Sequence, residues 1–346
     1  MPEKEPMYKM PDLLNLMVDS GAADLHVRVG IPPAYRDGGT LKRVEGPDCE
    51  PEDVEYLVKA IANDDEVQNI RTVGGADFGF AFGTKARFRV SAFKERGNMA
   101  LVLRQIPNEL LPLDVIGLDE TLIMRLLNTP RGMILVTGPT GSGKSTTLAA
   151  IINEINKTRT ANIITVEDPV EFIHKDVKSI VSHREVGKQT QTFASALKAA
   201  LREDPDVILV GEMRDLETVS LALTAAETGH LVFGTLHTSG APNTINRIID
   251  VFPPEQQAQI RAQISTSLKM VVTQRLLKTK DGQGRCGAFE VMKCTAPIQN
   301  LIREAKIHQI PSIMQTAVKD GMITMAKSLE ELVKAGKIDA GAGKEH

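Results

Sequence analysis

Gly138-Pro139-Thr140-Gly141-Ser142-Gly143-Lys144-Ser145-Thr146 is the segment that most constrains how this chain can fold. It fits the pattern G-x-x-x-x-G-K-[ST] at every fixed position, the pattern of a loop that binds nucleotide phosphates. The apolar residues 133–137 before it predict a buried strand, and residues 147–152 after it predict the start of a helix. Because the motif requires this strand, loop and helix context, the match predicts a phosphate-binding loop rather than an ordinary glycine-rich turn.

Each kind of residue in this loop has a physical role. Glycines let backbone N–H groups turn inward around an anion, and the N-terminus of the following helix adds partial positive charge. Lys144 is predicted to reach the β- and γ-phosphates of a bound nucleotide, and Ser145 to ligate Mg²⁺. All nine residues 138–146 are therefore predicted to take part in binding the nucleotide.

Composition limits the classes of protein that fit. A chain of 346 residues predicts about two domains, and 41 Lys and Arg against 44 Asp and Glu give a net charge of −3. No global basic field indicates a nucleic-acid partner, and 4% aromatic residues without Trp leave little to stack bases on. Three scattered cysteines argue against a zinc site or a disulfide framework. The first residues lack the apolar run of a signal peptide, and no apolar run reaches the ~20 residues of a membrane span, which predicts a cytosolic protein.

Residues 1–108 predict a small α+β domain. Their apolar spacing predicts helices and alternating strands, with helices at 12–19 and 51–62 and strands at 24–29, 34–42 (two strands and a turn), 77–82, 86–93 and 99–106. Pro107, Pro112 and Gly117 predict a linker at 109–117.

Four arginines of this first domain, Arg87, Arg89, Arg96 and Arg104, lie on adjacent predicted strands or turns and so could form one cationic face. Charge on the solvent side of a strand accounts for them equally well. The alternative is that some of them act as arginine fingers, which stabilise charge on a transferring phosphoryl group.

Residues 118–346 alternate between strands and helices, which predicts a mainly parallel sheet covered by helices. Four predicted strands, at 133–137, 162–166, 206–210 and 231–236, are each followed by a polar group that could take part in binding or catalysis. These groups are the glycine-rich loop, Glu167, Glu212 and His237. Ligands bind at the carboxyl ends of strands in such sheets, so we expect the four groups to converge on one crevice.

Phosphoryl transfer to water needs clamped phosphates, a held metal and an oriented water. Glu212 is the candidate to hold Mg²⁺ together with Ser145, and Glu167 is the better candidate to polarise the attacking water. His237 could sense or stabilise the γ-phosphate, and His230 precedes the same strand. For the glutamates, a loop carboxylate or a helix cap is the alternative, and for the histidines a structural role.

Five segments together resemble the secretion-type hexameric ATPases, and most closely the type IV pilus retraction ATPases; they are residues 20–26, 138–146, 164–171, 207–215 and 228–238. The resemblance implies an α/β fold, with a RecA-like P-loop NTPase domain behind a smaller PAS-like α+β domain. It also implies that Glu167 is the catalytic base, that Glu212 is the Walker B acid and that His230 and His237 are His-box residues. By the same resemblance, arginines of the first domain contact the nucleotide.

The resemblance further implies a homohexameric motor that hydrolyses ATP with Mg²⁺ and drives pilus retraction and twitching motility through domain rotations. Its implied partners are the inner-membrane platform protein of the pilus and a paralogous retraction ATPase, without nucleic acid, and its implied location is cytoplasmic and peripheral to the inner membrane. Residues 297–304 match six of the eight positions of the family's Ala-Ile-Arg-Asn-Leu-Ile-Arg-Glu motif, with departures at Pro297 and Gln299. A plainly packed helix would explain the same apolar spacing.

Other functions stay open at this point. An accessory retraction paralogue or another secretion-type ATPase would share most of these motifs, and a nucleic-acid translocase would share the RecA-like core. A GTPase would need Asn-Lys-x-Asp to recognise guanine, whereas residues 156–159 lack the Asp. A nucleotide sensor without turnover is disfavoured by the presence of both Glu167 and Glu212.

Overall fold

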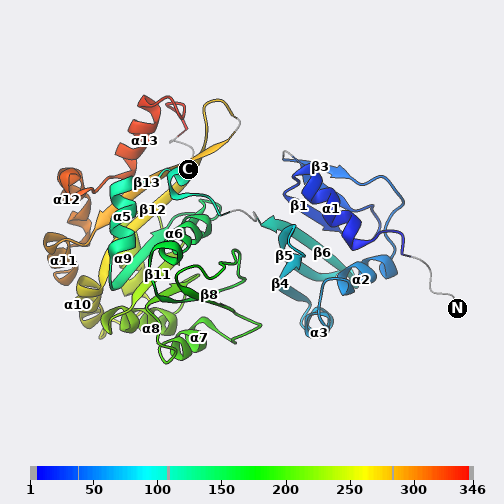
Figure 1. The fold of residues 1–346 in the computed structure, drawn as a ribbon, viewed down its shortest axis with the longest axis horizontal. Helices are drawn as coiled ribbons and strands as arrows, with labels where there is room; N and C mark the ends of the chain where they lie inside the picture. The colour runs from blue at the N-terminus through cyan, green and yellow to red at the C-terminus, as the bar shows by residue number, and fades with distance from the viewer. Residues whose placement is uncertain (1–5, 38, 107–109, 283, 343–346) are drawn as a thin grey trace. The chain divides into compact units, whose positions relative to one another are not determined.

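The computed structural model describes residues 6–37, 39–106, 110–282 and 284–342, in two compact units, Met1–Glu109 and Leu110–His346 (Figure 1). Of the expected linker at 109–117, residue 109 lies outside the described residues, as does Pro107. The rest belongs to the second unit, where Leu113–Ile116 form the short helix α4. Leu113 is buried in that unit's core, so this stretch is packed as well as connecting.

The first unit is built on a six-stranded antiparallel sheet in the order β3-β2-β1-β6-β5-β4. Its strands are β1 Asp24–Val27, β2 Ala34–Asp37, β3 Thr40–Arg43, β4 Gly75–Phe82, β5 Ala86–Glu95 and β6 Asn98–Ile106. Helices α1 Met10–Ser20 and α2 Pro51–Lys59 bury their apolar side chains against this sheet in a single core. Gly38, within the expected turn between β2 and β3, lies outside the described residues.

The second expected helix of this unit differs from the prediction at its end. It stops at Lys59 instead of residue 62, and a further helix, α3 Asp64–Thr72, follows. Asn63 accepts a hydrogen bond from the Glu66 backbone N–H, and the Glu66 carboxylate accepts one from the Asn63 backbone N–H. This capping box starts a new helix, and Asn-x-x-Glu is the sequence signal that predicts it.

The second unit is organised around a seven-stranded sheet in the order β13-β12-β7-β11-β10-β8-β9. Its strands are β7 Gly132–Thr137, β8 Asn162–Glu167, β9 Ile180–Glu185, β10 Val207–Val210, β11 Leu231–Leu236, β12 Leu268–Lys278 and β13 Arg285–Lys293. Pairing is parallel throughout except between β12 and β13. The expected mixed α/β fold with a parallel sheet is confirmed.

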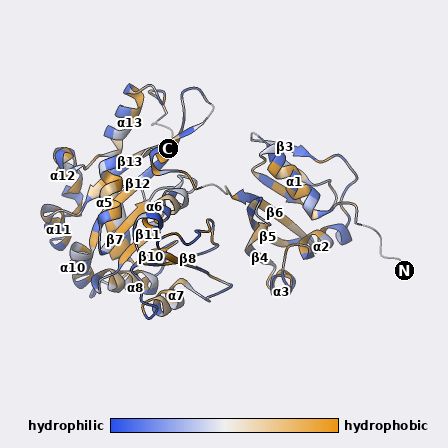
Figure 2. Cartoon of the chain, viewed as in Figure 1, coloured by the Kyte–Doolittle hydropathy of each residue, from blue (hydrophilic) through white to orange (hydrophobic). Residues whose placement is uncertain are grey.

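Two apolar layers cover the two faces of this sheet. Met133 and Leu135 of β7 face one layer, and Ile134 and Val136 face the other, as alternation along a strand requires. Figure 2 shows the central strands as predominantly hydrophobic ribbon. The helices are α5 Glu120–Asn128, α6 Lys144–Thr158, α7 Phe193–Ala200, α8 Leu216–Glu227, α9 Ala241–Asp250, α10 Gln257–Ser267, α11 Ala296–Arg303, α12 Ile310–Thr316 and α13 Met325–Lys334.

The segment that resembles the retraction motif forms helix α11. Ile298, Leu301 and Ile302 are buried in the core, and Pro297 lies in the first helical turn, where its missing N–H costs nothing. Gln299 donates from Nε2 to the Cys294 carbonyl oxygen at 3.2 Å. The apolar stripe of α11 therefore packs in the core of the second unit. Among the described residues, no helix combines the length and apolar character that crossing a bilayer requires.

Candidate nucleotide-binding site

The expected convergence of strand ends occurs in the second unit. β7, β11, β10 and β8 are neighbours in the sheet and run parallel, so their carboxyl ends share one edge. The glycine-rich loop follows β7, His237 follows β11, Glu212 lies two residues beyond β10, and Glu167 is the last residue of β8. Four segments far apart in the sequence thus bring their polar groups to the same edge.

The glycine-rich loop is held closely against strand β12. Gly138 has φ 141°, and a Cβ built there would lie 2.2 Å from the Gln274 carbonyl oxygen, so only glycine fits. The Gln274 side chain accepts a hydrogen bond from Thr147 Oγ1 at 2.7 Å, which ties β12 to helix α6 behind the loop. The loop's shape therefore depends on a strand that lies far away in the sequence.

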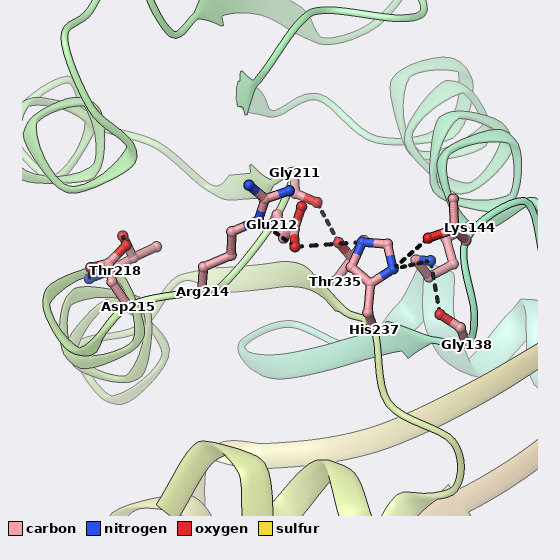
Figure 3. A network of polar contacts seen from close by, with 10 residues as sticks. Gly138, Lys144, Gly211, Glu212, Arg214, Asp215, Thr218, Thr235 and His237 are labelled. Carbon is pink, nitrogen blue, oxygen red and sulfur yellow. Dashed lines mark hydrogen bonds and ion pairs between the residues drawn. The ribbon is translucent and has the colours of Figure 1, made fainter. Parts of the chain in front are cut away.

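Lys144 is the first residue of α6, and its side chain folds back into the loop (Figure 3). Its Nζ donates to the carbonyl oxygens of Gly138 at 2.9 Å and Pro139 at 3.1 Å. Burial lowers the pKa of Lys144, and the carboxylates of Glu212 and Glu171 oppose that shift. The ammonium group is thus held where phosphate oxygens could replace the loop carbonyls as its acceptors.

The geometry of the glycine-rich loop is suited to bind an anionic ligand. Ser142 is buried, and its Oγ has no hydrogen-bond partner among the described residues. The first N–H groups of α6 have no partner within the helix. Together with the Lys144 ammonium, these donors match a nucleotide's phosphates, and Ser145 and Glu212 are the residues that would hold Mg²⁺.

The Glu212 carboxylate contacts two side chains, those of Arg214 and His237 (Figure 3). Its Oε1 lies 2.5 Å from Arg214 Nε and 3.4 Å from His237 Nε2. Burial works to raise the pKa of Glu212, but the hydrogen bond and charge of Arg214, with the charges of His237 and Lys144, lower it. The carboxylate is therefore kept ionised, as a Mg²⁺ ligand must be.

Glu167 occupies a different environment. Burial raises the pKa of its carboxyl group to about 7, while hydrogen bonds from the Thr165 side chain and the Glu171 backbone work in the opposite direction. The charges of Glu171 and Glu185 add to the upward shift. A general base works best when its pKa lies near the operating pH, so this carboxylate is suited to accept a proton from water.

The two histidines expected at this site lie at opposite ends of β11. His237 follows the strand, with Nδ1 3.4 Å from Thr140 Oγ1 and 3.5 Å from Lys144 Nζ. His230 precedes the strand, with Nδ1 2.9 Å from the Ala225 carbonyl oxygen. The six residues of β11 separate them by ~20 Å. His230 therefore lies at the opposite end of β11 from His237, and a role for it at the nucleotide stays a prediction.

The four candidate arginines belong to the first unit, and the antiparallel sheet separates them into two groups. Arg89 on β5 pairs directly with Arg104 on β6, and Arg87 lies two residues before Arg89 on the same face. Arg104 Nε also lies 2.7 Å from Asp24 Oδ1. Arg96 lies in the turn after β5, at the other end of that strand, with φ 51°. Contact between any of these arginines and nucleotide stays a prediction.

Three residues that shape the site have no predicted role from the sequence. Arg214 could have been noticed, because it follows Glu212 by two residues at the end of an apolar strand. Thr165 could have been noticed as a polar residue that alternates with apolar ones in β8. Gln274 had no such signal, since its partner Thr147 is 127 residues away.

Comparisons with known proteins agree with this geometry. The family model "Type II/IV secretion system protein" matches residues 10–339. The type IV pilus retraction ATPase PilT of Pseudomonas aeruginosa is 48% identical over 94% of both chains, and PilU of the same organism is 38% identical over 94% of this chain and 85% of its own. A crystal structure of the pilus retraction motor PilT with bound ADP superposes with a TM-score of 0.91, at 46% identity, covering 98% of this chain and 96% of the other. The expected resemblance is confirmed, and the chain belongs to the type II/IV secretion system protein family of ATPases.

Proposed function

We propose that this chain is a motor ATPase that hydrolyses ATP with Mg²⁺ to drive type IV pilus retraction. The observation that carries the proposal is the meeting of Lys144, Glu167, Glu212 and His237 at one edge of the parallel sheet. Greater identity to PilT than to PilU supports retraction itself rather than the accessory role.

Each group has a distinct part in the proposed reaction. Lys144 would exchange the loop carbonyls for the β- and γ-phosphates. Ser145 and Glu212 would hold Mg²⁺, which would neutralise charge on the phosphates. Glu167 accepts a proton from the attacking water, and His237 bridges the Glu212 carboxylate and the Lys144 side of the loop. The Glu212 oxygen that contacts Arg214 and His237 is one of the two oxygens that could hold the metal.

The proposal extends to the assembly. We place the chain in a homohexamer at the cytoplasmic face of the inner membrane, where ATP-driven domain rotations act on the pilus platform protein. A paralogous retraction ATPase is a further partner, and nucleic acid is not. Arginines of the first unit, from among Arg87, Arg89, Arg96 and Arg104, complete the nucleotide site. A nucleic-acid translocase remains the alternative from another class, and DNA-stimulated hydrolysis would favour it.

The test is Glu167→Gln, which keeps the size of the side chain and removes the base. Steady-state ATP turnover should fall by about 10²- to 10⁴-fold with ATP affinity retained. A cell that carries this variant in place of the natural copy should stop twitching and accumulate surface pili. Glu154→Gln on α6, which replaces a glutamate paired with Lys157, is the matched control. Wild-type turnover in Glu167→Gln would remove Glu167 as the base, and bald cells would indicate extension instead of retraction.

A further inference from the structure

The turn that carries Glu212 lies beyond the end of its strand, so strand pairing does not place it. β10 ends at Val210, which is paired with Gly234 of β11, and Glu212 follows two residues later. In the proposed reaction Glu212 would hold Mg²⁺, and a metal ligand works only when other groups keep it in one orientation. Contacts outside the strand ladder must therefore fix this turn.

Thr235, the residue after Gly234 on β11, makes a hydrogen bond on each side of Glu212. Its side chain is buried, and its Oγ1 donates to the carbonyl oxygen of Gly211 (Figure 3). Its own backbone carbonyl oxygen accepts from the Met213 N–H at 3.0 Å. The residue before Glu212 and the residue after it are thus both bonded to one threonine of the neighbouring strand.

Close packing leaves this turn little room to move. The Gly211 N–H donates to the Val166 carbonyl oxygen at 2.8 Å, and a Cβ built on Gly211 would lie 3.2 Å from Glu167 Cα. On the other side, a Cβ built on Gly234 would lie 2.5 Å from Met213 Sδ, so the glycine makes space for that buried side chain. The turn is therefore held between the ends of β8 and β11.

The side chains that contact the Glu212 carboxylate are more exposed than Thr235. Arg214 and His237 both lie near Glu212 Oε1, but 73% and 42% of their side chains are exposed. Ion pairs at such positions compete with solvent and hold geometry weakly. The hydrogen bonds of Thr235 are sheltered from water, so they are the more rigid support of Glu212.

We propose that Thr235 is a positioning residue for hydrolysis, which holds the turn 211–213 so that the Glu212 carboxylate can meet Mg²⁺ together with Ser145. This inference rests on the proposed function, in which Glu212 and Ser145 hold the metal. Thr235 acts through the backbone of the turn and does not itself touch the phosphates. Its loss should therefore weaken the use of Mg²⁺ and spare the binding of nucleotide without metal.

The test compares variants that remove the Thr235 hydroxyl with one that keeps it. Thr235→Val removes the hydroxyl at nearly constant shape, Thr235→Ala removes it without placing a methyl group beside the Gly211 carbonyl, and Thr235→Ser keeps it. Thr244→Val is the matched control, because the buried Thr244 hydroxyl also donates to a glycine carbonyl oxygen, that of Gly240, at 2.9 Å. Denaturant midpoints show whether each variant is folded, and either hydroxyl-free variant is sufficient for the test.

Two measurements on the full chain report the use of Mg²⁺. Binding of a fluorescent, non-hydrolysable ATP analogue is titrated against free Mg²⁺ and repeated in EDTA, and ATP turnover is titrated against Mg²⁺. The half-saturating Mg²⁺ concentration should rise about tenfold in Thr235→Val and Thr235→Ala. A larger rise is not expected, because the bond from the Met213 N–H remains. Affinity in EDTA should not change, since Lys144 and the glycine-rich loop are intact.

Thr235→Ser and Thr244→Val should keep the wild-type Mg²⁺ requirement. In a Glu212→Gln background, Thr235→Val should raise that requirement no further, because the turn no longer presents a carboxylate. A wild-type Mg²⁺ requirement in the folded hydroxyl-free variants would overturn the proposal. So would an equal loss of affinity in EDTA, which would indicate general damage to the site, or additive effects in the double variant.

Glu212→Gln separates this inference from the proposed function on which it rests. A wild-type Mg²⁺ requirement in Glu212→Gln would remove Glu212 as the residue that holds the metal, and the positioning role of Thr235 with it. A raised requirement in Glu212→Gln with an unchanged one in Thr235→Val would leave the proposed function standing and overturn the role of Thr235 alone.

Discussion

The two ends of strand β11 carry the same residue type in opposite circumstances. His237, at the carboxyl end, lies beside Lys144 and Glu212, with 42% of its side chain exposed. His230, at the amino end, is 2.9 Å from the Ala225 carbonyl oxygen and 3.2 Å from Thr228 Oγ1. One ring contacts charged side chains, and the other contacts the turn after helix α8. Strand direction places the two histidines at opposite edges of the sheet, and a chemical role for either of them stays a prediction.

This difference extends along the whole parallel sheet. Lys144, Glu167, Glu212 and His237 all lie at or just beyond the carboxyl edge, because every one of these strands points the same way. The antiparallel sheet of the first unit has no such edge, since neighbouring strands end on opposite sides. The candidate arginines of the first unit accordingly separate into two groups. Arg87, Arg89 and Arg104 lie on the paired strands β5 and β6, and Arg96 lies in the hairpin turn.

The largest effect is expected when a cationic residue beyond the carboxyl end of β7 is compared with one at its amino end. Lys144→Ala should lower kcat/KM for ATP by about 10²- to 10³-fold, because it removes the positive charge that clamps the phosphates. Arg131→Ala, an exposed residue directly before β7, is the matched control and should lose far less. Steady-state hydrolysis and nucleotide-binding titrations measure both. Unchanged ATP affinity in Lys144→Ala would break the assignment of this edge to the phosphates.

The second test concerns the protonation of Glu167. Burial raises the pKa of this carboxyl group to about 7, and a protonated carboxyl cannot accept a proton from water. The single-turnover hydrolysis rate should therefore be full above that pH and fall about tenfold per unit below it. ATP affinity over the same range is the control, because the phosphate clamp does not use Glu167. A rate that stays flat well below neutrality would contradict the role of Glu167 as the base.

The third test compares the two histidines directly. His237→Ala should lower ATP turnover by about tenfold, since it removes a neighbour of both Glu212 and Lys144. His230→Ala should instead lower the free energy of unfolding by about 1 kcal/mol, because it removes the hydrogen bond to Ala225. Each variant is assayed for turnover and for its denaturant midpoint. A greater loss of turnover in His230→Ala would show that the amino end of β11 reaches a nucleotide by another route.

The smallest effects are expected in the antiparallel sheet. Arg89→Gln and Arg104→Gln should each lower turnover a few-fold and to a similar extent, because the two residues are paired across β5 and β6. Arg96→Gln, in the hairpin turn, should change turnover less. Losing the pair between the exposed Arg104 and the buried Asp24 should cost about 1 to 3 kcal/mol of stability, because it leaves the carboxylate with only the more distant Arg36. If the three substitutions lowered turnover equally, the arginines would act through their overall positive charge instead of through a specific contact with the nucleotide.

Much of the parallel sheet could be predicted from the sequence because its signals are local. The mainly apolar stretches before residues 138, 167, 212 and 237 are short and followed by polar groups, and the structure confirms each strand. Helix α3 was missed although its capping box was visible, because the apolar spacing of the helix before it ran on to residue 62. Strands β12 and β13 were missed because nothing nearby in the sequence says that they extend the sheet beyond β7.

Sequence alone determined the phosphate-binding loop, the alternation of strands and helices, and the kinds of residue at the strand ends. Such features depend on spacing over a few residues, where backbone geometry and apolar periodicity act. Only the tertiary structure decided that Arg214 holds Glu212 and that Gln274 of β12 lies against the glycine-rich loop and accepts a hydrogen bond from Thr147. Those relations depend on strand order and register, which long-range packing sets and short stretches of sequence do not encode.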